Sequence, residues 1–287
     1  MKKSLNNFVL YWVEKNLYSD SGVDELVGLT GYSRRSLENF FLHENGLSIG
    51  SYILKRKMSR AALMLRITHI PINEIAHLFH YHNGQNFSRA FRNYTGLTPT
   101  DYRNAPQWNN RALQAPLLNL TPEFSPEIVT MEKTFMIAGK KINYATGFTS
   151  VDDKEFTKYV IPCVDSLFSG DTQSLWISAC LNKRGNLAEN RDGLTNIDVT
   201  VGYPLADVPA ANIETKAIPA GKYAKLTFSG SLEDYLIFSR IAYIKTLTEY
   251  NVSWQGNSTF IEVVEFNMEK SEIGCNIYIP ISETTYP

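Results

Sequence analysis

The feature that most constrains the fold of this sequence is a repeat within its first hundred residues. Each copy has two large apolar residues four positions apart, followed five positions later by a glycine turn. The copies lie 50 residues apart and consist of Leu37, Phe41 and Gly46-Leu47-Ser48, then Phe87, Phe91 and Gly96-Leu97-Thr98. Residues four apart share one face of a helix, and glycine ends helices. The repeat therefore predicts two tandem helix-turn-helix units in an all-α domain.

The residues around the repeat predict the helices that complete these units. An apolar stripe with i, i+3, i+4, i+7, i+8 spacing indicates a helix over residues 4–17. Its members are Leu5, Phe8, Val9, Trp12 and Val13. We expect Ser33 and Asn83 to cap the second helix of each unit. A helix over 49–66 connects the units, and its roughly 18 residues span about 27 Å. Successive major grooves of B-DNA lie about 34 Å apart, so this spacing suits two helices in adjacent grooves.

The pattern changes after residue 107. Residues 104–126 carry four prolines and little charge, which is typical of a linker. Beyond them, β-branched and aromatic residues alternate in segments that predict strands. These segments are 127–145, 173–181, 195–205, 221–230, 259–267 and 273–281. Helices are expected near 154–169 and 232–249. We predict three parts: a DNA-binding domain over 1–107, a linker over 108–125, and an α+β domain with an antiparallel sheet over 126–287.

Charge is divided unequally between these parts. Residues 1–107 hold 13 Lys and Arg against 8 Asp and Glu, whereas residues 108–287 hold 15 against 21. The basic part is the candidate for binding a polyanion, although an ordinary solvated surface also fits. The longest apolar runs are too short to span a membrane, and no signal-peptide cleavage site follows the N-terminus, so we expect a cytoplasmic protein. Three cysteines without a C-x-x-C pair predict reduced, packed thiols.

The first part resembles a known family. The run NFSRAFRNYTGLTPTDYR, residues 86–103, is similar to the signature of AraC/XylS transcriptional regulators. The run GYSRRSLENFFLHENGLSIGSYILKRKMSRAAL, residues 31–63, resembles the first helix-turn-helix and connecting helix of that family. The resemblance covers about residues 5–107. It implies a DNA-binding regulator, most often an activator, that contacts RNA polymerase, and it gives Phe87, Phe91, Gly96, Pro99 and Tyr102 structural roles.

The resemblance also implies which residues face DNA. In the second unit they are Gln85, Asn86, Arg89 and Arg92, and in the first Arg34, Arg35, Glu38 and Asn39. The connector adds Arg56 and Lys57, and His80 is a candidate for a phosphate. Gln and Asn bond adenine, and Arg bonds guanine or phosphate. The first unit departs from the family, because Asn39 stands where Arg is common and Leu42 where a basic residue is usual. The alternative is a set of polar residues on a solvated helix face.

The second part is similar to the GyrI-like effector-binding domain, which is a pair of β-α-β-β units. The resemblance rests on residues 218–247, the run FIEVVEF and the closing YIPI. It implies that Glu262 attracts a cationic or polar ligand among aromatic walls. The candidate walls are Trp176, Tyr203, Tyr223 and Trp254. The family's companion tyrosine, two residues after the carboxylate, is Val264 here. The alternative is that these aromatic residues are sheet core and that Glu262 is exposed or paired.

Catalytic and metal chemistry are weaker interpretations. No His occurs beyond residue 107, so a Ser/His/Asp triad cannot form there, and no phosphate-binding glycine loop is present. A hydrolase that uses Glu262 as an acid or base stays an alternative. His77, His80 and His82 lie near one another without Cys, which does not favour zinc. We expect no enzyme activity, no cofactor, no metal and a monomer. A second domain that only stabilises or sequesters the DNA-binding part is the remaining alternative.

Overall fold

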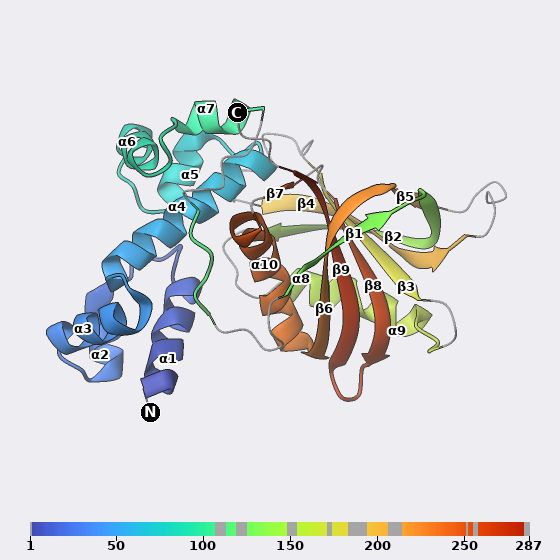
Figure 1. The fold of residues 1–287 in the computed structure, drawn as a ribbon, viewed down its shortest axis with the longest axis horizontal. Helices are drawn as coiled ribbons and strands as arrows, with labels where there is room; N and C mark the ends of the chain where they lie inside the picture. The colour runs from blue at the N-terminus through green and yellow to red at the C-terminus, as the bar shows by residue number, and fades with distance from the viewer. Residues whose placement is uncertain are drawn as a thin grey trace. The chain divides into compact units, whose positions relative to one another are not determined.

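A computed structural model describes residues 2–106, 113–118, 125–147, 154–170, 174–182, 194–205, 214–250, 252–254 and 258–283. The chain divides into two compact units, the first formed by residues up to 119 and the second by most of the chain from residue 120 onward. Each unit has the composition of elements that the sequence predicts, helical in the first and α+β in the second (Figure 1). Within the described residues, no helix combines the length and the apolar character needed to cross a membrane.

In its described residues, the N-terminal unit contains helices and no strands. Its helices are α1 Lys2–Lys15, α2 Val23–Thr30, α3 Arg34–Asn45, α4 Ile49–Ile67, α5 Ile72–Leu78, α6 Gly84–Thr95 and α7 Pro99–Asn104. The predicted caps are confirmed: Ser33 accepts the backbone N–H of Ser36 at 3.2 Å, and Asn83 accepts that of Asn86 at 2.8 Å. These bonds satisfy donors that the first turn of a helix leaves free, and they set where α3 and α6 begin.

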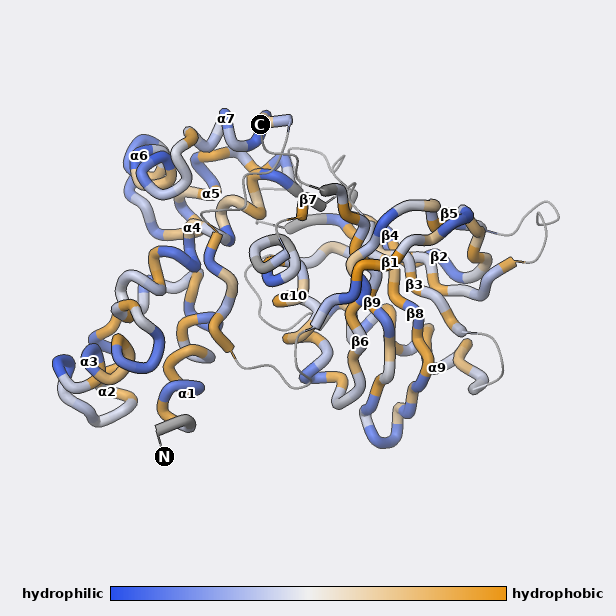
Figure 2. The backbone as a smooth tube through the Cα atoms, in the orientation of Figure 1, coloured by the Kyte–Doolittle hydropathy of each residue, from blue (hydrophilic) through white to orange (hydrophobic). Residues whose placement is uncertain are grey.

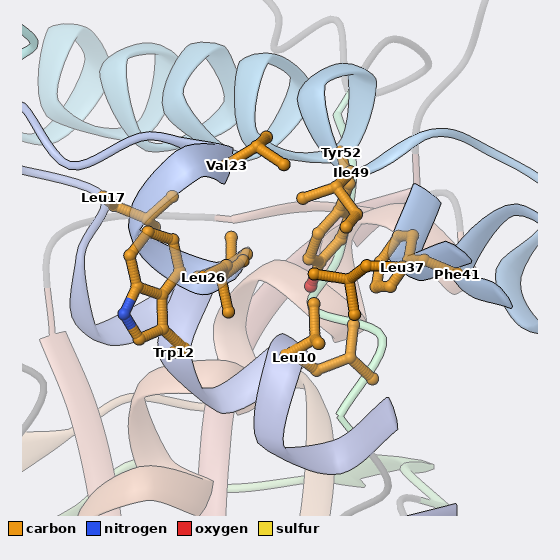
Figure 3. Packing of buried hydrophobic residues seen from close by; sticks show 11 residues of the cluster. Leu10, Trp12, Leu17, Val23, Leu26, Leu37, Phe41, Ile49 and Tyr52 are labelled. Carbon is orange, nitrogen blue, oxygen red and sulfur yellow. The ribbon is translucent and has the colours of Figure 1, made fainter. Parts of the chain in front are cut away.

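The apolar faces of α1 to α4 meet in one core. Figure 3 shows Leu10 and Trp12 of α1 packed with residues of α2, α3 and α4, among them Leu26, Phe41 and Tyr52. The predicted stripe on α1 is confirmed except at Phe8, which is 43% exposed, while Leu10 is fully buried. Successive residues of an α-helix are rotated by about 100°. Leu10 therefore lies at one edge of the predicted stripe, on the same side as the buried Leu17, and faces the core.

The two copies of the repeat fold alike at their ends. Gly46 and Gly96 end α3 and α6 with φ of 74° and 82°, a left-handed conformation that favours glycine. Two residues later, Ser48 and Thr98 cap the next helix. A tyrosine then packs on the phenylalanine at the second apolar position of each copy, with ring centroids 5.8 Å apart for Tyr52 on Phe41 and 5.3 Å for Tyr102 on Phe91. The copies are therefore two versions of one supersecondary unit.

Residues 113–118 pack on α4 rather than forming part of a free linker. We call this segment the strap. The backbone N–H of Gln114 donates to Ser59 Oγ at 2.7 Å, and that of Leu117 donates to the hydroxyl of Tyr52 at 3.0 Å. Leu113 and Pro116 are buried. The predicted boundary at residue 107 is therefore too early, because part of the proline-containing segment belongs to the N-terminal unit.

The C-terminal unit is built on one antiparallel sheet. The strands are β1 Glu127–Met131, β2 Phe135–Gly147, β3 Leu175–Asn182, β4 Leu194–Pro204, β5 Thr215–Ile218, β6 Gly221–Ser231, β7 Val252–Trp254, β8 Ser258–Asn267 and β9 Glu272–Glu283. The order is β1-β6-β9-β8-β3-β4-β2-β5, with β7 on β9. The helices are α8 Lys154–Tyr159, α9 Ile161–Leu167 and α10 Leu232–Glu249. The short strands β5 and β7 had no signal in the sequence pattern.

The sheet has two halves with the same order of pairing. In the first, β2 precedes α8 and α9, and then β3 and β4 follow; in the second, β6 precedes α10, and β8 and β9 follow. The last strand of each half lies between the other two, and β3 pairs with β8 at the centre. The helix expected over 154–169 is two short helices, and Pro162 lies at the start of the second.

Alternate residues of the strands face opposite sides of the sheet. One side, the helix side, carries Phe228 of β6, which packs on Tyr235 and Phe238 of α10. The other side, the open side, carries a second set of buried residues. Gly139 and Gly202 pair across β2 and β4 on the open side. A Cβ on either would lie 2.0 Å from a backbone oxygen of the other strand, so this close approach requires glycine.

Candidate functional site

The second helix of the second unit, α6, presents one polar face. Gln85, Asn86, Arg89 and Arg92 are all exposed, whereas Phe87 and Phe91 are fully buried. Gln85, Arg89 and Arg92 follow each other at spacings of four and three, so they lie along one side of the helix. Figure 2 shows α6 largely in blue, the hydrophilic end of its scale. The buried phenylalanines anchor the helix, and its outward face is free of other helices of the unit.

The equivalent helix of the first unit, α3, has a different outward face. Arg35 and Asn39 are exposed, at positions that match Gln85 and Arg89 in the repeat. Arg34 is exposed as well, but its guanidinium forms an ion pair with Asp24 at 2.7 Å. Leu42, the counterpart of Arg92, is 48% exposed. This helix therefore offers fewer free cations than α6.

Glu38 is turned toward the next helix rather than outward. Its Oε2 accepts the backbone N–H of Ile49 at 3.2 Å, at the first residue of α4. The bond satisfies one of the donors at the start of α4, and a carboxylate is favourable there because of the helix dipole. Within this structure, Glu38 links α3 to α4, a role that its sequence position did not suggest.

Arg56 is not a surface residue, which corrects its assignment as a DNA contact. Its side chain is 1% exposed, and Nε and Nη2 donate to the two oxygens of Glu14 at 2.7 and 2.9 Å. Nη1 donates to the backbone oxygen of Gln114 in the strap. Burial alone would lower the pKa of Arg56, but the charge of Glu14 raises it above its ordinary value. The guanidinium is thus a buried, paired charge inside the N-terminal unit.

Lys57 and His80, which were also predicted to contact DNA, each bond to the backbone of another segment of the protein. The ammonium of Lys57 lies 3.4 Å from the backbone oxygen of Ser19, and burial lowers the pKa of Lys57. His80 is exposed, and its Nε2–H donates to the backbone oxygen of Tyr18 at 2.8 Å. Its φ of 62° is unusual for a residue with a side chain. Lys57 of α4 and His80, which follows α5, thus both bond to the segment between α1 and α2.

In the C-terminal unit, Glu262 lies on the open side of the sheet. Its Oε2 accepts the side-chain N–H of Asn276 and the hydroxyl of Tyr278, each at 2.9 Å. Both partners come from β9, which pairs with β8 so that Glu262 faces Asn276 directly. Burial, and then the bond to Glu262, raise the pKa of Tyr278. The tyrosine bonded to the carboxylate thus comes from the neighbouring strand, while Val264 is exposed.

An aromatic cluster surrounds this carboxylate. Trp176 lies opposite Glu262 across β3 and β8, and it stacks on Tyr278 with ring centroids 5.3 Å apart. Tyr223 packs edge-on against Tyr278 at 6.3 Å. The structure therefore brings together Trp176, Tyr223 and Glu262 as predicted. It adds residues that sequence reasoning missed, namely Phe135, Phe260, Asn276 and Tyr278.

Of the other two predicted walls, Tyr203 lies outside the cluster. Tyr203 lies on the helix side, because it pairs with Ala138, one residue from the Gly139–Gly202 pair of the open side. Its hydroxyl donates to the backbone oxygen of Leu167, the last residue of α9. That assignment is wrong, and the reason is the alternation of residues along β4. The side chain of Trp254 lies outside the described residues, although its backbone pairs with Ile281.

Comparison with known proteins bears mainly on the N-terminal unit. A model described as a helix-turn-helix domain matches residues 26–105. Transcriptional regulator Rob of Salmonella typhimurium is 32% identical over 148 residues, which are 50% of each chain. The chain thus spans about half the length of the first curated relatives that it matches.

Two further comparisons cover that unit alone. The C-terminal domain of AraT, a response regulator from Geobacillus stearothermophilus, covers 34% of this chain and 83% of its own at 28% identity. The TM-score of this comparison is 0.33. The multiple antibiotic resistance protein MarA of Salmonella typhimurium is 35% identical over 95 residues, which are 33% of this chain and 75% of MarA. The chain therefore belongs to the AraC/XylS family of helix-turn-helix transcriptional regulators.

Proposed function

We propose that this protein is a transcriptional activator that binds double-stranded DNA through α3 and α6. The observation that carries the proposal is the repeated unit, with one polar helix face exposed in each copy. The connecting helix α4 has 19 residues, which corresponds to about 28 Å. That length is compatible with two helices in successive major grooves about 34 Å apart. Because the proposed partner is DNA, we place the protein in the cytoplasm, with RNA polymerase as a further partner.

The two helices would read DNA differently. Gln85 and Asn86 are suited to adenine, and Arg89 to guanine or phosphate. In α3, Asn39 takes the place of Arg89 and Leu42 that of Arg92, and Arg34 is paired with Asp24, so α3 has fewer free cations for phosphates. We therefore propose a non-palindromic site, in which α6 supplies most of the salt-dependent affinity and α3 supplies sequence preference.

Substitution of Arg89 tests the DNA-binding proposal. We expect Arg89→Ala to weaken binding to a selected site by about 10-fold or more, since one good base contact contributes about 1 to 3 kcal/mol. The measurement is a titration by fluorescence anisotropy at several salt concentrations. Lys15→Ala is a matched control, because it removes one exposed cation of α1. Equal affinities for the two variants would contradict the assignment of α6.

We further propose that the C-terminal unit is a GyrI-like domain that binds an organic cation at Glu262. Support comes from a partly buried carboxylate beside the rings of Trp176 and Tyr278 on one side of the sheet. Ring faces and a carboxylate together favour a cation that also has apolar surface. Both hydrogen bonds to Glu262 go to Oε2, so Oε1 is the oxygen for a ligand's charge.

One observation favours a second candidate, a domain without a ligand. Trp176 and Tyr223 are 7% and 2% exposed and pack on other rings of the cluster. Mutual packing of this kind is also what a plain core shows. In that case the domain would stabilise or sequester the DNA-binding unit. A hydrolase that uses Glu262 is a third candidate, in which the groups bonded to the carboxylate would be Asn276 and the hydroxyl of Tyr278.

The variant Glu262→Gln separates these candidates. Gln keeps an oxygen that can accept from Asn276 and Tyr278 but removes the charge. We expect it to weaken binding of tetraphenylphosphonium at least 10-fold by calorimetry, while the DNA affinity of the ligand-free protein stays unchanged. Glu265→Gln is the control, because it removes an exposed carboxylate from the same strand. If the wild-type protein does not bind the cation at all, the domain without a ligand is the better interpretation.

A further inference from the structure

Ser178 is a buried hydroxyl on the open side of the sheet. It lies in β3, two residues beyond Trp176, and therefore on the same side of the sheet as Trp176. Across the strands, Ser178 faces Phe260 of β8 and Thr200 of β4. Phe260 in turn faces Tyr278 of β9. The hydroxyl thus belongs to the row of residues next to the one that contains Trp176 and Glu262.

The hydroxyl of Ser178 is one of the buried side-chain groups of the described residues that have no hydrogen-bond partner. The residue is 1% exposed, and its Oγ has no hydrogen bond within the part of the chain that the structure describes. Among the polar groups nearby, Glu262 is paired with Asn276 and Tyr278, and Asn276 also with Thr227 at 2.9 Å. Buried polar groups of native proteins are almost always hydrogen-bonded, because an unpaired one loses its bonds to water without replacement.

The register places Ser178 within reach of a molecule bound at Glu262. Glu262 is two residues along β8 from Phe260, the partner of Ser178, so the two are diagonal neighbours on one face. Such neighbours are about 7 to 8 Å apart. A drug-sized molecule with its charge at Glu262 and its rings along Trp176 would therefore extend over Ser178.

We propose that Ser178 is a second polar anchor of the ligand site, and that the ligand is an organic cation bearing a hydroxyl, carbonyl or amide about 7 Å from its charge. This inference rests on the proposed cation site. It narrows the ligand class, because a cation with only hydrocarbon groups would leave Ser178 without a partner. A site built to hydrogen-bond a polar group discriminates against the analogue that lacks it.

A pair of cations that differ by one hydroxyl tests the proposal on the full-length protein. The probes are tetraphenylphosphonium and (4-hydroxyphenyl)triphenylphosphonium, measured by calorimetry against wild type and Ser178→Ala. We expect wild type to prefer the hydroxylated cation by about 3- to 10-fold, the range of one net hydrogen bond. Ser178→Ala should remove this preference while binding tetraphenylphosphonium as tightly as wild type. Its Tm without ligand should be no lower, because no bond within the protein is lost.

The outcomes distinguish this inference from the proposed function. If wild type binds both cations equally, or if Ser178→Ala keeps the preference, the role of Ser178 is wrong while the cation site stands. If neither cation binds to wild type, both the cation site and the anchor are wrong. Ser229→Ala, which removes an exposed hydroxyl from β6, is the control and should leave the preference intact.

Discussion

At the scale of single residues, two arginines of the N-terminal unit have opposite surroundings: one is exposed and the other is buried. Arg89 and Arg56 both lie on helices that the family resemblance assigns to DNA binding. Arg89 is exposed, whereas Arg56 is enclosed with Glu14 and the strap. A buried guanidinium is tolerated only when its charge and its donors are satisfied. The role of each arginine therefore follows from its surroundings and not from its type.

The buried pair gives a prediction about stability. We expect Glu14→Gln to lower the free energy of unfolding by about 3 to 5 kcal/mol, because it leaves the charge of Arg56 buried without its partner. Urea denaturation followed by circular dichroism measures this change. Asp24→Asn breaks the exposed pair with Arg34 and should cost at most about 1 kcal/mol. Similar losses for the two variants would show that the buried Arg56–Glu14 pair contributes no more to the free energy of unfolding than an exposed pair does.

At the scale of elements, the strap explains why the N-terminal unit extends beyond α7. It satisfies three groups along α4: the guanidinium of Arg56, the hydroxyl of Tyr52 and the hydroxyl of Ser59. These residues are separated by four and three positions, so they lie on one face of the helix. An extended segment covers that face without adding a helix.

Truncation before the strap tests this role. We expect a fragment of residues 1–106 to be less stable than a fragment of residues 1–119 by about 2 to 4 kcal/mol, as estimated from three lost hydrogen bonds of roughly 1 kcal/mol each. Thermal and urea denaturation of both fragments give the difference. Equal stability would mean that the strap packs on α4 without stabilising it.

At the scale of the whole molecule, the two units have independent cores and separate chemistry. The N-terminal unit presents two outward helix faces, and the C-terminal unit holds a carboxylate among aromatic rings on a sheet of its own. A single chain with two recognition helices can occupy an asymmetric site without forming a dimer. Regulation by a ligand would then require only that binding at the sheet changes the affinity of the helical unit for DNA.

A footprinting experiment tests the two-helix arrangement. One protein molecule should protect about 20 base pairs, two turns of the duplex, on one side. We expect Asn39→Ala and Arg89→Ala to lose protection in different halves of the site. Loss in the same half, or a stoichiometry of two molecules per site, would contradict binding by one chain with two helices.

Much of the helical unit was predictable because its signals are local. Phe87, Phe91 and the αL glycines act over one or two helical turns, so periodicity and caps identify the helices and their ends. The exposed face of α6 follows from the same periodicity. The roles of Glu38 and Arg56 were not predictable, because their partners lie 11 and 42 residues away. Whether such a charge faces solvent or a partner depends on how distant segments pack.

The sequence by itself determined the two-part organisation, the tandem helix-turn-helix units, the family and the strand-rich character of the second half. Local periodicity and turn residues carry that information. Only the tertiary structure decided that Tyr278, and not a residue beside Glu262 in the chain, bonds its carboxylate, and that Tyr203 faces the helices. Strand register and side depend on pairing between strands far apart in sequence, and a shift of one residue reverses every side chain.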